Sequence, residues 1–314
     1  MAREPPTRKF TDMQTVPVTR QHLLGSVIAV PPLARNADYS LNREANRAVI
    51  RHIEAGGVTT FLYGGNANFY HIRLSEFGSA LDLLAAEAGA ESLMIPSVGP
   101  CYGTMMDQAA ILQQHEFPTV MVLPMQGVLS DDGVATGFRH FVEAFGRTSV
   151  LYLKDEAYLR PATAARLVKD GLVSFIKYAI VRENPSHDAY LTELLDLIGG
   201  DAIVSGIGEQ PAIVHVRDFG LTGYTSGCVC IAPALSRRML LAIQEGAWEE
   251  AETIREQFRP LEDLRNAIHP IRVLHEAVAL AGIADTGELL PLMSRVGEAH
   301  RPSIATAAKA LLGC

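Results

Sequence analysis

The sequence predicts an α/β protein: a (β/α)8 TIM barrel with a C-terminal helical appendage. Short apolar segments alternate with segments of helical spacing over about 210 residues, a pattern typical of βαβ units and a parallel sheet. Eight such apolar segments follow one another without an obvious break, which favours closure of the sheet. A doubly wound sheet is the alternative. Its usual dinucleotide signature is absent, because the glycine-containing run 64–68 lacks the G-x-G-x-x-G spacing, and there is no P-loop.

The expected strands are apolar runs bounded by prolines, glycines or polar residues, and they cover residues 26–30, 59–63, 92–95, 119–123, 149–153, 173–178, 202–204 and 223–229. Pro31 and Pro32 end the first run. Between the strands, the spacing of apolar residues predicts helices over residues 40–55, 76–88, 104–114, 133–145, 163–169, 187–198 and 211–219. Gly56 and Gly57 follow the first of these helices, where a glycine C-cap is expected.

After Pro233 the alternation stops and helix follows helix, with expected ranges of 235–245, 249–259, 266–281 and 289–312. The predicted organisation therefore has three parts. Residues 1–21 form an N-terminal lead-in, residues 22–233 form the barrel, and residues 234–314 form the C-terminal helical region.

Composition limits the classes of function. The chain has 314 residues, 48% of them hydrophobic, and a net charge of −8, which argues against a nucleic-acid or anionic-membrane surface. No apolar stretch is long enough to cross a bilayer, and the polar N-terminus has no apolar signal region, so we expect a cytoplasmic protein. The four cysteines do not form a disulfide framework, and neither they nor the histidines show metal-ligand spacing, so no metal site is expected. Small molecules are the expected partners.

Lys177 interrupts the apolar run 173–180. Lysine is almost never fully buried without a reason. Near the carboxyl end of a parallel strand, loss of solvent would lower the pKa of the amine and make it a nucleophile that can form a Schiff base with a carbonyl. In the alternative interpretation, which strand position alone favours, Lys177 extends to solvent or pairs with a carboxylate.

Active sites of barrels lie at the carboxyl ends of the strands, so residues that follow different strands should meet at one mouth. Tyr152 ends the fifth expected strand and could move protons to and from a substrate, although a tyrosine in a strand is otherwise an ordinary core residue. Gly65 and Asn66 follow the second strand and offer N–H groups to a carboxylate, or simply form a tight turn. Gln126 follows the fourth strand, and Gly206 follows the seventh.

Four short runs, in this order, carry a resemblance to a known family: Gly64-Gly65-Asn66, Val150-Leu151-Tyr152, Phe175-Ile176-Lys177 and Ser205-Gly206. The chain resembles the dihydrodipicolinate synthase and N-acetylneuraminate lyase family, class I aldolases on a (β/α)8 barrel, over most of its length. The resemblance implies that Lys177 forms a Schiff base with a 2-keto acid, typically pyruvate, and that Tyr152 is the proton-relay acid/base. It also implies a homo-oligomer, a tetramer or a dimer. No cofactor is expected, because the imine itself supplies the electron sink.

The sequence departs from the family pattern at the turn that binds the substrate carboxylate, which falls on residues 65–69. Both hydroxyl residues of the family turn are replaced. Asn66 would then have to supply the side-chain contact, while the backbone N–H groups of Asn66 and Ala67 could still hold a carboxylate. The substrate-binding residues implied in this way are Gly65, Asn66, Ala67, Gln126 and Gly206.

Two further departures concern the substrate. The run 152–156, Tyr-Leu-Lys-Asp-Glu, lacks the arginine that holds aspartate semialdehyde in the family's synthases, and the run 123–126 replaces their interface tyrosine. We therefore expect a lyase or aldolase that acts on pyruvate or another 2-keto acid and is not a true dihydrodipicolinate synthase. One alternative is a keto-sugar-acid dehydratase, since the run from Tyr152 to Asp155 resembles the 5-dehydro-4-deoxyglucarate dehydratase branch. A non-catalytic barrel that binds a metabolite is a second alternative, suggested by the altered turn.

Overall fold

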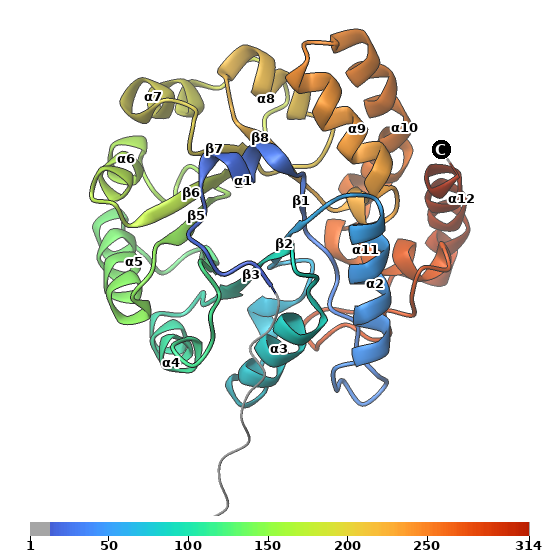
Figure 1. Cartoon of the computed structure of the whole chain (residues 1–314), viewed down its shortest axis with the longest axis horizontal. Coiled ribbons are helices and arrows are strands. Elements are labelled where there is room, and N and C mark those ends of the chain that lie inside the picture. The colour runs from blue at the N-terminus through green and yellow to red at the C-terminus, as the bar shows by residue number, and fades with distance from the viewer. Residues whose placement is uncertain (1–12, 314) are drawn as a thin grey trace, which may run out of the picture.

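The computed structural model describes residues 13–313, and its centre is a closed barrel of eight parallel strands in sequential order (Figure 1). The predicted fold class is confirmed. The strands are β1 (Ile28–Ala29), β2 (Thr60–Tyr63), β3 (Leu93–Val98), β4 (Met121–Val122), β5 (Ser149–Leu153), β6 (Val173–Tyr178), β7 (Ile203–Ser205) and β8 (Gly223–Ser226). Closure is completed by the pairing of β1 with β8, in which Ile28 lies opposite Thr225. The hydrophobic core fills the barrel and the space beneath the helices.

Seven helices connect the strands and form an outer ring (Figure 1): α2 (Arg43–Ala55), α3 (Leu74–Glu87), α4 (Tyr102–Leu112), α5 (Asp131–Phe145), α6 (Pro161–Lys169), α7 (Ala189–Ile198) and α8 (Ala212–Phe219). Each lies close to its expected range. The last expected strand, however, is shorter than predicted. β8 ends at Ser226, because the chain turns at Gly227 into the 3-10 helix η2 (Cys228–Cys230).

The C-terminal region contains α9 (Pro233–Gln244), α10 (Trp248–Ala267), α11 (Pro270–Leu280), η3 (Glu298–His300) and α12 (Arg301–Leu312). Three predicted boundaries were wrong here. The expected helix 266–281 begins only at Pro270, because α10 occupies its first residues. The expected helix 249–259 continues through Pro260 to Ala267, because buried Phe258 and Leu261 keep its inner face on the core. The expected helix 289–312 is helical only from residue 298, and Leu292 before it has a left-handed backbone with φ of 78°. The longer α10 brings its last turn over the carboxyl ends of the strands.

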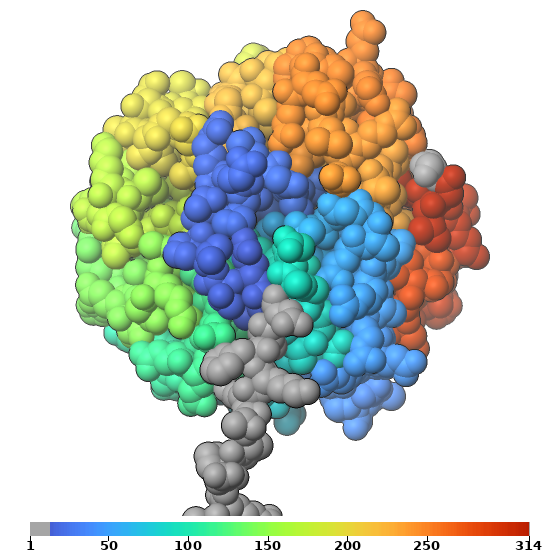
Figure 2. Space-filling view, in the orientation of Figure 1, coloured from blue at the N-terminus to red at the C-terminus, as the bar shows by residue number. Residues whose placement is uncertain are grey.

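The amino ends of the strands are covered by residues 13–25, which include the short helix α1 (Arg20–Gly25). The part of the predicted lead-in before residue 13 lies outside the described residues. Met13 and Leu23 are buried, and the N–H of Gln14 donates to the carbonyl of Ser92 just before β3. Figure 2 shows this blue segment lying across the middle of the molecule on that face. The opposite end of the barrel is therefore the end where a site can open.

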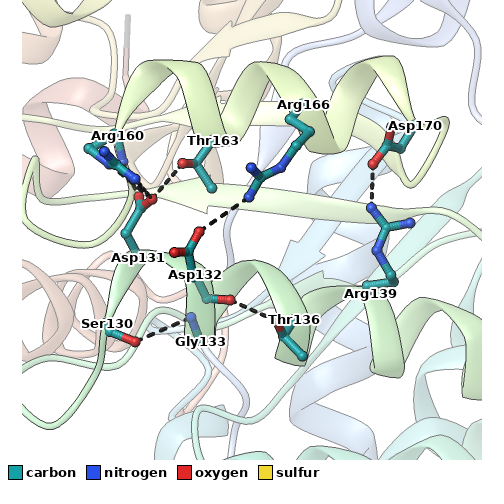
Figure 3. A network of polar contacts seen from close by, with 10 residues as sticks. All are labelled: Ser130, Asp131, Asp132, Gly133, Thr136, Arg139, Arg160, Thr163, Arg166 and Asp170. Carbon is teal, nitrogen blue, oxygen red and sulfur yellow. Dashed lines mark hydrogen bonds and ion pairs between the residues drawn. The ribbon is translucent and has the colours of Figure 1, made fainter.

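A network of charged side chains joins α5 to α6 and fixes the loop that leads away from β5 (Figure 3). Asp131, in the first turn of α5, accepts hydrogen bonds from the backbone N–H, Nε and Nη2 of Arg160 at 2.7, 3.0 and 2.7 Å. Thr163 donates to the same carboxylate. The carboxylate of Asp132 beside it contacts Arg166 at 3.5 Å, and its side chain is 81% exposed. Asp131 is therefore the residue of this network that the structure depends on most.

Replacement of Asp131 by Asn should lower the free energy of unfolding by about 1–3 kcal/mol at pH 7, because hydrogen bonds to a charged group are lost. Partial burial opposes ionisation, but the bonds from Arg160 and Thr163 hold the pKa of Asp131 below its ordinary value. The ionised carboxylate of Asp131 therefore adds to the free energy of unfolding above the pKa of an unfolded aspartate. This contribution disappears as the pH falls through the lowered pKa of the folded state. Urea denaturation at pH 7 and pH 3 measures this difference. Asp132→Asn is the matched control, and an equal effect of both variants would contradict the assignment.

Of the helices among residues 13–313, none is both long enough and apolar enough to cross a membrane.

Candidate active site

A cavity of about 340 Å³ opens at the carboxyl ends of the strands. It is lined by Val30, Gly65, Asn66, Tyr70, Tyr152, Lys154, Lys177, Ala179, Val181, Gly206, Ile207, Gly208, Thr225, Gly227, Glu262, Arg265, Asn266, His269, Pro270, Ile271 and Met293. Five of the seven predicted site residues are therefore brought together: Lys177, Tyr152, Gly65, Asn66 and Gly206. Ala67 does not line the cavity. Gln126 lines an adjoining pocket of about 240 Å³, which shares Tyr70 and Lys154 with the main cavity.

Lys177 lies at the centre of this group. Its side chain is only 6% exposed, and within residues 13–313 it forms no ion pair or hydrogen bond with another side chain. Of the alternative interpretation, the pairing with a carboxylate is not found among the described residues, and the side chain of Lys177 lines the cavity. Burial first, and then the neighbouring cations Lys154 and Arg265, together lower the pKa of Lys177 to about 7. Near neutral pH a large fraction of the amine is therefore uncharged and nucleophilic.

Tyr152 is the residue opposite Lys177 on the neighbouring strand β5. Its ring presents its face to the lysine, with the ring centroid 4.4 Å from Nζ. Burial raises the pKa of Tyr152 to about 12, so the phenol keeps its proton at neutral pH. A protonated hydroxyl beside a neutral amine can donate a proton to the oxygen of a carbonyl that the amine attacks.

Sequence reasoning missed Tyr70, which comes from the 3-10 helix η1 (Phe69–His71) and lines both the cavity and the adjoining pocket. Its hydroxyl donates to the carbonyl of Pro124 across a long 3.4 Å. Burial, followed by the proximity of Tyr152 and Tyr158, raises the pKa of Tyr70 above its usual range. No spacing in the sequence could have indicated this residue, because only the fold brings η1 next to the loop after β4.

The turn after β2 differs from the expectation. The side-chain Nδ2 of Asn66 donates to the carbonyl of Val30 at 2.7 Å, and the carbonyl of Asn66 accepts from Nε2 of His275 at 2.7 Å. The N–H of Ala67 donates to the carbonyl of Gly64, and Ala67 is 1% exposed. Of the donors expected to hold a substrate carboxylate, the Asn66 amide is thus used to tie the turn to the end of β1, and the N–H of Ala67 is used within the turn itself.

Gly206 has a packing role next to the lysine. A Cβ at this position would lie 3.0 Å from Cγ of Lys177 and 2.7 Å from the carbonyl oxygen of Tyr178. The N–H of Gly206 donates to that same carbonyl. Glycine is therefore needed here because β7 passes close to the stem of Lys177.

A buried acidic cluster lies at one edge of the cavity, where ligand atoms of Glu209, Cys228 and Glu262 lie within 4.8 Å of one another. Ser226 and Ser236 donate to the two carboxylate oxygens of Glu209, at 2.7 and 2.8 Å.

The oxygens of Glu262 accept the backbone N–H groups of Glu209 and Gln210, at 2.9 and 3.0 Å. Burial raises the pKa of both glutamates, and Glu209 raises that of Glu262 further. Nη1 of Arg265 lies 3.8 Å from the Cys228 thiol. Protein donors thus already bind these carboxylates and a cation lies beside them, so the cluster links α10 to the segment before α8 and to η2.

Comparison with known proteins identifies relatives of this barrel. The model of the dihydrodipicolinate synthetase family matches residues 27–311. A 4-hydroxy-tetrahydrodipicolinate synthase of Chlorobium phaeobacteroides (strain BS1) is 24% identical over 288 residues, which cover 88% of this chain and 93% of that protein. The corresponding synthase of Corynebacterium diphtheriae is 21% identical and covers 86% of this chain and 88% of its own length.

Solved structures show the same fold. Dihydrodipicolinate synthase from Oceanobacillus iheyensis superposes with a TM-score of 0.78 at 19% identity, over 94% of this chain and 98% of that chain. YagE, a prophage protein of the dihydrodipicolinic acid synthase family from E. coli K12, was solved in complex with pyruvate. It superposes with a TM-score of 0.80 at 18% identity, over 92% of this chain and 99% of that chain.

Replacement of Lys177 by Met should raise the free energy of unfolding, because an apolar side chain of similar length takes the place of a buried amine. The folded pKa of about 7 lies below the value of 10.5 for a free lysine, so the cost of burial is fully present below pH 7 and fades as the pH rises toward 10.5. The increase in the free energy of unfolding caused by Lys177→Met should reach up to roughly 5 kcal/mol at pH 6 and become smaller at pH 10. Denaturation at both pH values tests this, with Lys169→Met on the exposed surface of α6 as the control. A gain that does not vary with pH would contradict the lowered pKa.

Proposed function

Because this chain belongs to the dihydrodipicolinate synthetase family, as its sequence resemblance predicted, we propose that it is a Schiff-base-forming lyase or aldolase that acts on pyruvate or another 2-keto acid. The family consists of lyase- and synthase-type enzymes on this barrel. The observation that carries the proposal is Lys177, a buried amine without a counter-charge, next to the protonated phenol of Tyr152. A buried amine of this kind is costly to keep and is expected where its reactivity is used.

In the proposed reaction, the neutral amine of Lys177 attacks the ketone carbon of the keto acid and forms a carbinolamine. Tyr152 donates a proton to the hydroxyl, which leaves as water, and an imine forms between Nζ and the substrate carbon. The protonated imine withdraws electrons from the adjacent carbon, so that a C–C bond there can break or form. Because this electron sink is part of the protein, the proposal requires no metal or organic cofactor.

We further propose that the enzyme is not a true dihydrodipicolinate synthase. The loop after Tyr152 places Lys154, and no arginine, at the cavity, so the family's contact to aspartate semialdehyde has no counterpart there. A dehydratase that uses the same imine is the second candidate, supported by the run from Tyr152 to Asp155.

Self-association into a dimer or tetramer and a cytoplasmic location also stay predictions. Exposed Tyr102 and Val128, beside an apolar cavity of about 880 Å³ between α4 and α5, favour self-association.

Incubation with pyruvate and borohydride should add one reduced pyruvate to the intact protein, detected by mass spectrometry, and peptide mapping should place it on Lys177. Lys177→Ala should show no adduct, whereas Lys154→Ala, which removes the other lysine of the cavity, should still be trapped. Tyr152→Phe should slow trapping by about 10²- to 10⁴-fold, because the proton donor is lost.

No adduct with pyruvate or with longer 2-keto sugar acids would overturn the proposed mechanism and leave the non-catalytic barrel as the account. If an adduct forms, supplying aspartate semialdehyde together with pyruvate should give no cyclic product. Release of pyruvate from a keto sugar acid identifies the aldolase, and loss of water without C–C cleavage identifies the dehydratase.

A further inference from the structure

We propose that His275 of α11 positions the turn after β2 for the acid group of the substrate, because its bond to the carbonyl of Asn66 keeps the backbone N–H of Asn66 available to the carboxylate. This inference rests on the proposed Schiff-base function and on the carboxylate-binding turn that the family resemblance implies. Its new part is the control of that turn by a residue of the C-terminal region, 209 residues further along the chain.

The backbone N–H of Asn66 is the donor that the turn leaves free. Nδ2 of Asn66 donates to the carbonyl of Val30, and the carbonyl of Asn66 accepts from Nε2 of His275, both at 2.7 Å. Among residues 13–313, the N–H of Asn66 has no acceptor, and the residue lines the cavity that contains Lys177. An unpaired backbone N–H beside a cavity is suited to bind one oxygen of a carboxylate.

His275 is a buried residue whose ring is fixed in one tautomer. It is 4% exposed, and burial lowers its pKa to about 4, so the imidazole is neutral at pH 7. A neutral imidazole carries one N–H, and the carbonyl of Asn66 can only accept, so the hydrogen lies on Nε2. The bond to Asn66 therefore uses the single N–H of the ring.

His275 can hold the turn because its own backbone is tied to the loop after β1. Oγ1 of Thr286 donates to the carbonyl of His275 at 2.9 Å, and the N–H of Arg35 donates to the carbonyl of Thr286 at 3.0 Å. Asn66 is bonded to Val30, directly after β1. The turn after β2, the end of β1 and α11 thus form one hydrogen-bonded group.

Loss of the His275 donor should change the turn and leave the lysine in place. The peptide between Asn66 and Ala67 would lose the bond that holds its carbonyl, so the turn would be free to shift. Binding of a carboxylate by one N–H depends steeply on distance and angle, so a small shift weakens it. Among the described residues that line the cavity, His275 is not included, so it acts through Asn66 and not on the substrate directly.

The first test observes the N–H of Asn66 itself. Gly65-Asn66 is the one Gly-Asn pair in the sequence, so protein labelled with ¹³C at the glycine carbonyl and ¹⁵N at asparagine gives a single signal in an HNCO spectrum. Saturation with pyruvate should move the amide proton downfield, because the N–H gains a charged acceptor. Pyruvamide, the neutral amide of pyruvate, should move it much less. No shift with pyruvate, or an equal shift with both ligands, would overturn the proposal.

The second test measures the rate of borohydride trapping against pyruvate concentration. His275→Leu should raise the half-saturating concentration of pyruvate roughly 10-fold, with little change in the maximal rate and in the trapping of pyruvamide. His275→Gln keeps an N–H near the position of Nε2 and should restore most of the affinity. His52→Leu is the matched control, because Nε2 of His52 contacts the carbonyl of Ile231 at 3.0 Å and neither residue lines the cavity. The control should leave the half-saturating concentration unchanged.

An unchanged half-saturating concentration in folded His275→Leu protein would contradict the proposal, as would an equal effect of this variant on pyruvate and pyruvamide. If His275→Leu does not fold, His275→Phe, which keeps a ring without a donor, takes its place. Failure of the Schiff-base function is seen separately, because the unmodified protein then gives no trapped adduct, whereas the Asn66 signal can be followed in every variant without an imine.

Discussion

The structure of the site depends on one unfavourable arrangement, the burial of an amine without a counter-charge at the carboxyl end of β6. Closure of the barrel around Lys177 creates that arrangement: β5 presents the ring of Tyr152 on one side, and β7 comes close enough on the other that residue 206 has to be glycine. The neighbouring cations Lys154 and Arg265 add to the cost of this charge. The cost of this burial is met by the large core of the barrel, whose amino end is closed by residues 13–25.

Sequence predicted the central features well, because they depend on local patterns. Alternating apolar and helical segments indicated all eight strands, and the lysine within the run 173–180 was unusual enough to mark the site. The C-terminal region was harder. The helix expected over residues 249–259 continues through Pro260 as α10, because its buried face outweighs the lost hydrogen bond. That extension carries Arg265 to the mouth, so an error in one helix boundary concealed a cavity residue.

The bonding of the turn after β2 could not be predicted, and for a physical reason. The sequence shows which groups a turn contains, but not which of them are already bonded. The side-chain amide of Asn66 and the N–H of Ala67 are suitable donors, and the fold uses these two on Val30 and Gly64. Thr225 is an ordinary strand residue in the sequence. It becomes notable only because the barrel buries its hydroxyl in a cavity wall without a partner. Tyr70 could not be recognised in the sequence either, because the Pro124 carbonyl that its hydroxyl contacts lies 54 residues away in the chain.

The protonation state of Lys177 is the point on which the whole functional account depends. The chain has only five lysines, at positions 9, 154, 169, 177 and 309, so each can be resolved by NMR of protein labelled with ¹³C at lysine Cε. A titration, with Lys177→Met identifying the signal, measures the pKa directly. We expect the Lys177 signal to titrate near pH 7, the value to which burial lowers its pKa. Titration near 10.5, the value of a free lysine, would show a permanently charged side chain at neutral pH and would contradict the account.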